Sequence, residues 1–181
     1  MPKTVVITGA GRDRVGIVAD LTEFLFELGC NLLDSSMTLL RGEFALILMT
    51  TLPDSCSVED LQKKLAELQK KLSLSFSVRE LSADEIAEQE DELFQYIISV
   101  YGADKPGIVA GVTKELARHG LNITDVQTKS VRQPKGEIYV MMLELSSNQD
   151  LEVSELQGKL NQFGTELGVD VSVRKLEIME L

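Results

Sequence analysis

Apolar residues follow two repeating patterns along the chain, and the elements that these patterns predict come in a fixed order. Spacings of three and four predict amphipathic helices, while strict alternation predicts half-buried strands. In the first half we expect strand, helix, strand, strand, helix and strand at residues 3–8, 16–28, 31–40, 43–52, 58–72 and 74–78. Gly29 ends the first helix in the left-handed conformation, and Asp54 or Ser57 caps the second.

The second half of the chain repeats this pattern closely. Eleven residues return 91 positions later: Gly11, Asp13, Gly16, Ile17, Val18, Ala19, Thr22, Leu25, Gly29, Asn31 and Asp34 become Gly102, Asp104, Gly107, Ile108, Val109, Ala110, Thr113, Leu116, Gly120, Asn122 and Asp125. The helix that begins at Val58 returns 95 positions later, mainly because the hairpin at Arg41-Gly42 becomes the longer loop 132–136. Such self-similarity predicts two copies of one domain.

Two strand–helix–strand units joined by a hairpin predict the ferredoxin-like βαββαβ fold of the α+β class. Each copy is then a four-stranded antiparallel sheet with both helices on one face. We expect a first domain at 1–81, an acidic linker at 82–92 and a second domain at 93–181. The linker carries six acidic residues, a composition typical of a solvated segment with at most one turn of helix.

The strand at 43–52 is apolar on both faces, since Phe44, Leu46 and Leu48 alternate with Ala45, Ile47 and Met49. Two helices can cover only one face of a sheet. We therefore expect another domain or subunit to cover the second face, and we expect a homo-oligomer.

Charge and hydropathy exclude several classes of function. The formal net charge of −11 repels nucleic acid, and the middle strands lack the basic aromatic motif of RNA-binding modules of this topology. No apolar run approaches the roughly 20 residues of a membrane span. The residues Met1 to Thr4 lead straight into a strand, so we expect no signal peptide and a cytoplasmic protein.

Catalytic and metal-binding patterns are not found in the sequence. Cys30 and Cys56 have no counterparts in the second copy and are interpreted as reduced thiols rather than a disulfide. One histidine and two cysteines do not make a usual zinc site, so we expect no metal and no cofactor. His119 lies at a predicted helix end, where a cation favours the helix dipole, and this role is preferred over that of a general base.

The turn after the first strand of each copy carries the clearest binding signal. Gly16 and Gly107 open the helices, where free N–H groups of Ile17 and Val18, or of Ile108 and Val109, form an anion site suited to a carboxylate. Asp13 and Asp104 could accept from an ammonium group, which together would fit a free amino acid. The same spacing is also that of a plain turn and cap.

Asn31 and Asn122 open the second strand of each copy, directly after the helix that Gly29 or Gly120 ends. In the βαββαβ order this strand lies at the edge of the sheet, where another domain can pair with it. An exposed amide at its start could orient a ligand. Alternatively, the asparagine only caps the helix exit.

These motifs, Asp-x-x-Gly-Ile-Val-Ala and then Gly-x-Asn-Leu/Ile-x-Asp, resemble the ACT domain. The tandem arrangement resembles the glycine cleavage system transcriptional repressor family. That resemblance implies a regulatory protein that binds a free amino acid, glycine first, at domain interfaces and acts on transcription through a protein partner. It implies ligand contacts from Asp13, Gly16, Ile17, Val18 and Asn31 and from Asp104, Gly107, Ile108, Val109 and Asn122, in loops where Arg14 and Lys105 stand in place of the asparagine of some members.

Three hypotheses follow from these observations. The first is a non-catalytic amino-acid sensor that regulates transcription through its partner. The second is an allosteric subunit or interaction module of a metabolic enzyme, without a ligand of its own. The third is a small hydrolase, for which no residue pattern in the sequence argues.

Overall fold

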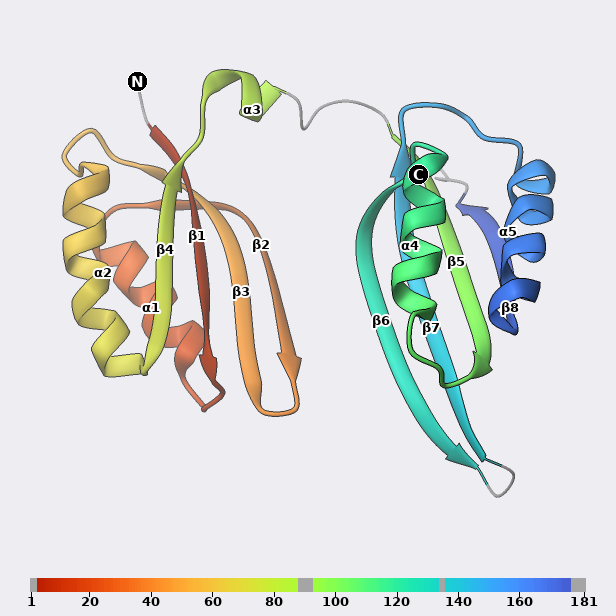
Figure 1. Cartoon of the computed structure of the whole chain (residues 1–181). Coiled ribbons are helices and arrows are strands. Elements are labelled where there is room, and N and C mark those ends of the chain that lie inside the picture. The colour runs from red at the N-terminus through yellow and green to blue at the C-terminus, as the bar shows by residue number, and fades with distance from the viewer. Residues whose placement is uncertain (1–2, 88–92, 134–135, 177–181) are drawn as a thin grey trace. The chain divides into compact units, whose positions relative to one another are not determined.

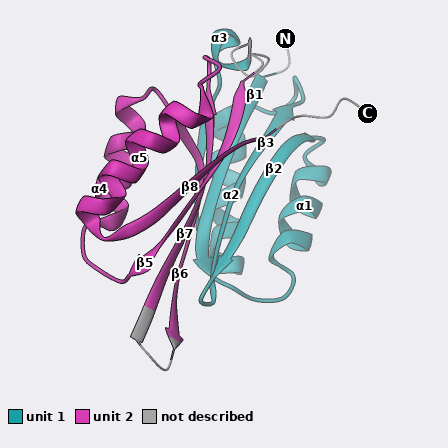
Figure 2. Ribbon diagram, turned by 90° about the vertical axis from the view of Figure 1, so that its right-hand side faces the viewer, with its two compact units in different colours: residues 1–90 teal, residues 91–181 magenta. Residues whose placement is uncertain are grey.

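The computed structural model describes residues 3–87, 93–133 and 136–176. Contacts divide the chain into two compact units, Met1–Glu90 and Asp91–Leu181, hereafter unit 1 and unit 2 (Figure 2). The boundary lies within the stretch predicted as a linker, and each unit has its own hydrophobic core.

Unit 1 has the predicted order of elements (Figure 1). Its strands and helices are β1 (Lys3–Arg12), α1 (Ile17–Glu27), β2 (Asn31–Leu40), β3 (Glu43–Leu52), α2 (Val58–Leu72) and β4 (Leu74–Glu80). The strands form an antiparallel sheet in the order β2-β3-β1-β4. This is the ferredoxin-like order, with β2 at one edge, so the fold prediction is confirmed.

Unit 2 repeats the arrangement with β5 (Phe94–Ala103), α4 (Ile108–Arg118), β6 (Asn122–Gln133), β7 (Gly136–Ser147), α5 (Val153–Leu167) and β8 (Val169–Leu176). Its sheet order is β6-β7-β5-β8, equivalent to that of unit 1. The register is also equivalent. Ile7 lies opposite Leu48 in unit 1, and Ile98 lies opposite Leu143 in unit 2. The loop 134–135 lies outside the described residues.

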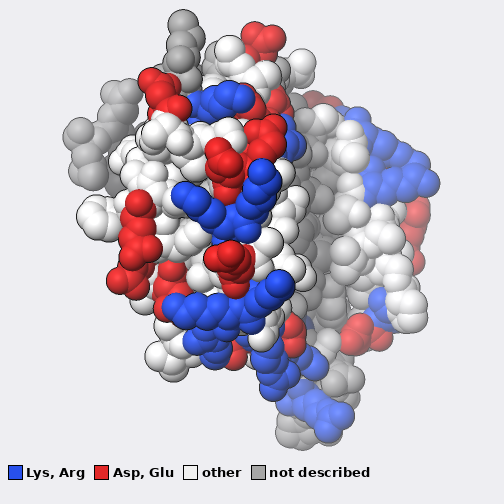
Figure 3. Space-filling model, turned by 90° about the vertical axis from the view of Figure 1, so that its left-hand side faces the viewer, with Lys and Arg blue, Asp and Glu red and all other residues white. Residues whose placement is uncertain are grey.

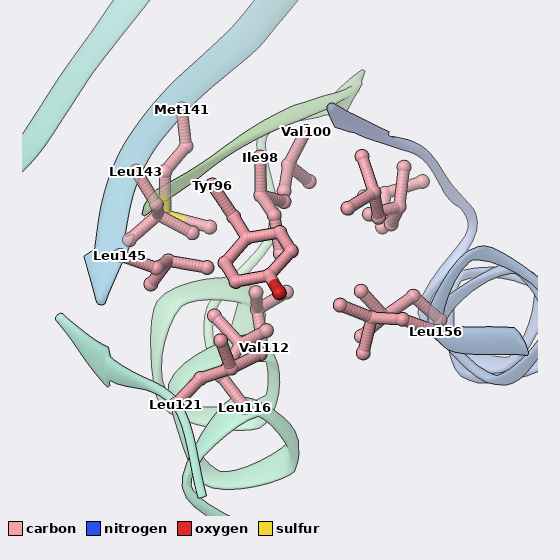
Figure 4. Close-up of a cluster of buried hydrophobic side chains, with 14 of the residues drawn as sticks. Tyr96, Ile98, Val100, Val112, Leu116, Leu121, Met141, Leu143, Leu145 and Leu156 are labelled. Carbon is pink, nitrogen blue, oxygen red and sulfur yellow. The ribbon is translucent and has the colours of Figure 1, made fainter. Parts of the chain in front are cut away.

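Each core forms between one face of the sheet and the two helices. In unit 2, side chains from β5 and β7 converge on residues of α4 and α5, as Figure 4 shows for Tyr96, Ile98, Val100, Met141, Leu143, Leu145, Val112, Leu116 and Leu156. Tyr96 is fully buried and its hydroxyl accepts from the Leu151 N–H at 2.7 Å. Burial of each large apolar side chain stabilises the fold by roughly 1.5–3 kcal/mol.

Helix ends follow the predicted residues. Gly29 and Gly120 have φ of 74° and 70°, so both adopt the left-handed conformation after α1 and α4. Ser57, rather than Asp54, caps α2, and its hydroxyl accepts from the Asp60 N–H at 3.1 Å.

Strand β1 is longer than predicted and runs to Arg12 instead of Thr8. The alternation of apolar residues stops at Gly9, but pairing with β3 continues through Ala10 opposite Ala45. Phe76 of β4 covers Gly9, where a Cβ would lie 2.6 Å from its ring. The backbone pairing therefore extends the strand beyond the part that the side-chain pattern marks.

The face of each sheet away from the helices keeps apolar side chains in solvent. In β3, Phe44, Leu46 and Leu48 are buried, while Ile47 on the other face is 49% exposed. Met142 of β7 is 45% exposed on the corresponding face of unit 2.

The stretch predicted as an acidic linker begins with a short helix, α3 (Ala83–Ala87). Ser82 and Glu85 form a reciprocal capping pair, and Arg79 of β4 makes an ion pair with Glu85. The backbone N–H of Ser82, followed by Arg79, lowers the pKa of Glu85 to about 2. These contacts hold α3 to β4, while residues 88–92 lie outside the described part of the chain.

Candidate functional site

Helices α1 and α4 begin with open N-termini. Gly16 and Gly107 occupy the N-cap positions with φ of 95°, and neither helix start has a side-chain capping hydrogen bond. The first intrahelical bonds run from Asp20 N–H to Gly16 and from Gly111 N–H to Gly107. The earlier N–H groups, including those of the predicted pairs Ile17–Val18 and Ile108–Val109, therefore point out of the helix. Such a terminus attracts an anion.

An aspartate stands beside each helix start, but in neither unit does it act as the cap. Asp13 is exposed, and its backbone N–H donates to the Gly42 carbonyl at 2.9 Å. Asp104 accepts from the Ser130 hydroxyl at 2.8 Å. Neither carboxylate caps the helix N–H groups, so each can accept from a second group of a ligand.

The basic residues of these turns contact the end of the next helix. Arg14 donates to Asp20 at 3.3 Å and to the Lys71 carbonyl at 3.5 Å. A hydrogen bond from Lys71 and the nearby Arg14 lower the pKa of Asp20. Lys105 donates to the Leu167 carbonyl at 3.5 Å. Both side chains therefore fasten the turn to the C-terminus of α2 or α5, where a cation is favourable.

Asn31 and Asn122 lie at the other end of α1 and α4 from the turns. An eleven-residue helix is about 16 Å long. Within one unit the structure therefore brings Asp13, Gly16 and their neighbours together but leaves the asparagine far from them. A single small amino acid cannot contact both groups unless another unit or another molecule supplies one of them.

Asn122 itself lines a polar hollow in unit 2. The hollow has a volume of about 460 Å³, and its polar residues are His119, Asn122, Ser146, Ser147, Asn148 and Gln149. The Asn122 amide donates to the Ser146 hydroxyl at 3.5 Å. No sequence motif marks the other five residues as a group. The polar run 146–149 was the available signal, because the equivalent positions of the first copy are Thr51, Leu52, Pro53 and Asp54.

A second hollow, of about 400 Å³, lies on the helix-free face of the sheet in unit 1. Its lining includes Asp34, Ser36, Ile47, Met49 and Arg79. Arg79 is already paired with Glu85, so its charge is neutralised locally. The sequence did not mark this place as a site.

His119 is the C-cap residue of α4, at the position where a cation favours the helix dipole. Its Nε2 lies 3.3 Å from Glu115 Oε1, but it is buried without hydrogen-bond geometry to any partner among the described residues. Arg118, followed by His119, lowers the pKa of Glu115. Within the described part of the chain, His119 thus lies beside Glu115 and Arg118 at the helix end.

Other chemistry is sparse in the described residues. Cys30 and Cys56 are free thiols, and burial raises the pKa of Cys30. Residues 3–87, 93–133 and 136–176 contain no group of three or more metal-ligating side chains. Among the described helices, none combines the length and the apolar character of a membrane span.

The sequence patterns of the ACT-domain family match both halves of the chain, at residues 3–79 and 96–161. A UPF0237 protein of Methanopyrus kandleri is 40% identical over 82 residues, which cover 45% of this chain and 88% of that protein. A UPF0237 protein of Streptococcus pneumoniae is 36% identical over 84 residues, which cover 46% of this chain and 91% of that protein.

Two solved structures match the whole tandem arrangement. An unknown protein from Galdieria sulphuraria is 28% identical with a TM-score of 0.80, and the match covers 98% of this chain and 100% of that one. A protein provisionally named as a glycine cleavage system transcriptional repressor is 19% identical with a TM-score of 0.77, and the match covers 98% and 99% of the two chains. At that identity the likeness shows the fold. With its two family matches and its two ferredoxin-like sheets, the chain belongs to the ACT-domain family as a tandem ACT protein.

Proposed function

We propose that this protein is a non-catalytic sensor of a free amino acid that regulates transcription through a protein partner. The observation that carries the proposal is the uncapped start of α1 and of α4, each beside an aspartate that does not cap it. Both ACT units have this arrangement, and ACT domains are regulatory modules that bind amino acids.

The two parts of each turn suit the two charges of a zwitterion. The ligand carboxylate binds the free N–H groups of Ile17 and Val18, or of Ile108 and Val109, and the ammonium group binds Asp13 or Asp104. Arg14 and Lys105 connect the turns to the C-terminal ends of α2 and α5. Glycine is the first candidate ligand, because one protein of the same tandem fold carries the name of a glycine cleavage system repressor.

Asn31 and Asn122 complete the site from a second copy of the chain, since each lies about one helix length from the turn of its own unit. The apolar face that includes Ile47 supports association. Binding shifts the protein between arrangements only if the ligand prefers one of them.

Regulation through a protein fits the surface charge better than direct contact with nucleic acid. The net charge is −11, and on the helical side of unit 1 acidic side chains are interspersed with basic ones (Figure 3). Such a surface lacks the favourable release of counterions that drives binding to DNA or RNA.

Calorimetry of the full chain with the common amino acids tests the proposal. We expect glycine or another small amino acid to bind, and we expect Asp13→Asn with Asp104→Asn to weaken binding at least about tenfold, because the ammonium group loses its charged partner. The control is Glu59→Gln with Glu152→Gln, which removes two exposed carboxylates at the starts of α2 and α5, whose opposite ends contact the turns. Lack of binding below about 10 mM by any amino acid would refute the sensor.

The exposed apolar sheet faces also favour a second function, that of an interaction module for a metabolic enzyme. Affinity capture with the full chain separates the two. A transcription factor whose association depends on the amino acid supports the sensor. A biosynthetic enzyme that is retained with and without amino acids supports the interaction module.

A further inference from the structure

One corner of the fold differs between the two units. It lies where the first helix of each unit ends and leads into the edge strand, next to the end of the neighbouring middle strand (Figure 1). Asn31 pairs with Thr51 there in unit 1, and Asn122 pairs with Ser146 in unit 2. The equivalent pairing makes the two corners directly comparable.

Apolar side chains fill the corner in unit 1. A Cβ placed on Gly29 would lie 3.6 Å from Pro53, which is ordinary contact. Leu52 is 1% exposed, and Leu28 packs against the core. The space beside the helix end is therefore occupied by the protein itself.

The corner of unit 2 is open. Nothing lies within 4 Å of a Cβ placed on Gly120. The residues that fill the corner of unit 1 are replaced by polar ones, with His119 in place of Leu28, Ser147 in place of Leu52 and Asn148 in place of Pro53. The result is the polar hollow of about 460 Å³ described above, within the size range of small-molecule sites.

The polar groups of this hollow are incompletely paired. Ser146 and Ser147 are each 5% exposed, and a buried hydroxyl is unfavourable unless it is hydrogen-bonded. Ser147 accepts from the Gln149 N–H at 3.1 Å, but the bond from Asn122 to Ser146 is long, at 3.5 Å. His119 Nε2 lies 3.3 Å from Glu115 Oε1 and is directed to that carboxylate rather than to a ligand. A ligand that both donates and accepts hydrogen bonds would pair with the hydroxyl groups of Ser146 and Ser147, which the protein pairs incompletely.

The lining contains amides and hydroxyls, with His119 as its one titratable residue among those described. The end of α4 adds a partial negative charge, which disfavours a carboxylate. A cation would lose its hydration, and the described residues of the lining offer it no carboxylate. We propose that this hollow binds a small uncharged molecule that carries hydroxyl or amide groups. The hollow shares Asn122 with the amino-acid site proposed above, but it lies about one helix length from the turn of unit 2 and does not depend on that site.

The test is an NMR titration of the isotopically labelled full chain with glycerol as the hydroxyl probe and propionamide as the amide probe. We expect at least one probe to shift the amide signals of Gly120 and Gln149 saturably and to leave Gly29 unchanged. Glycine serves as the charged comparison. If it binds as proposed above, it shifts Gly16 and Gly107, which we expect neither neutral probe to shift, so the two proposals fail independently.

A refilled variant provides the decisive control. Ser147→Leu with Asn148→Pro gives unit 2 the residues that fill the corner of unit 1, and we expect it to weaken probe binding at least about tenfold. His119→Leu introduces the residue that unit 1 has at the helix end, Leu28, and replaces the double variant as the control if that variant does not fold. Absence of saturable shifts with both probes at about 0.1 M would overturn the proposal. Equal shifts in a folded refilled variant would also overturn it, because they would mean an adventitious additive only.

Discussion

The two units share a backbone plan but differ in how their corners and turns are held. Both begin α1 or α4 with an open glycine turn, and both bury equivalent residues of the central strands. In unit 1 the turn is tied by Arg14, Asp20 and Lys71 together, and the opposite corner is filled by Pro53. In unit 2 Gly111 stands at the position of Asp20, and the described hydrogen bond of Lys105 goes to a backbone carbonyl. The opposite corner of unit 2 is hollow. A duplicated module thus keeps its core while its periphery diverges.

The largest expected effect tests whether the two cores are independent. Ile7 and Ile98 are equivalent and fully buried. We expect Ile7→Ala or Ile98→Ala to lower the free energy of unfolding of its own unit by about 2–5 kcal/mol, because a cavity replaces the lost side chain.

Chemical denaturation can follow the units separately, since all three tyrosines, Tyr96, Tyr101 and Tyr139, lie in unit 2. Ile98→Ala should shift the transition seen by tyrosine fluorescence. Ile7→Ala should shift only a part of the transition seen by circular dichroism. If Ile7→Ala moves the tyrosine transition equally, the units unfold as one body and the comparison between them loses its basis.

A smaller effect concerns the second helix of each unit. Ser57 caps α2, whereas Glu152 at the start of α5 makes no capping hydrogen bond. We expect Ser57→Ala to destabilise unit 1 by about 1 kcal/mol and Glu152→Ala to have a much weaker effect. Conversely, Glu152→Ser should stabilise unit 2. Equal losses for the two alanine variants in denaturant titrations would contradict this difference in capping.

The smallest effect is the pH dependence of the ion pairs of Asp20 with Arg14 and Lys71. Among the described residues, only unit 1 has these ion pairs. The pKa of Asp20 is lowered in the folded protein by the hydrogen bond from Lys71 and by Arg14. A lowered pKa contributes stability above the unfolded value, near 4, and this contribution is lost as the pH falls through the folded value. Asp20→Asn should therefore reduce the stability of unit 1 at neutral pH but not at about pH 2.

Urea titrations across this pH range provide the measurement, with Asp170→Asn in unit 2 as the control. Asp170 is an exposed aspartate that lies opposite Tyr101 in the sheet. A destabilisation by Asp20→Asn that stays constant with pH would mean that the lost contacts are not electrostatic.

Several elements could be predicted because their signals are local. The bounds of β2 and β3 follow from the hairpin residues Arg41-Gly42 and from the alternation of side chains in β3. Gly29 and Gly120, which end α1 and α4, have the left-handed conformation that glycine adopts easily. The end of β1 was predicted four residues early, because pairing with β3 continues where the side-chain pattern stops. The sequence predicts Asp54 or Ser57 as the cap of α2. In the structure Ser57 has an extended backbone, and its side chain accepts from the Asp60 N–H.

By itself, the sequence determined the duplication, the order of the elements and the identity of the turn residues, because periodicity and glycine positions act over a few neighbouring residues. The sequence also placed Gly16 and Asn31 at opposite ends of one helix. Only the tertiary structure brought His119, Asn122 and Ser146 together around a hollow. Such groupings depend on strand order and on which side chains fill the space between elements, and these are properties of the packed chain rather than of any short segment.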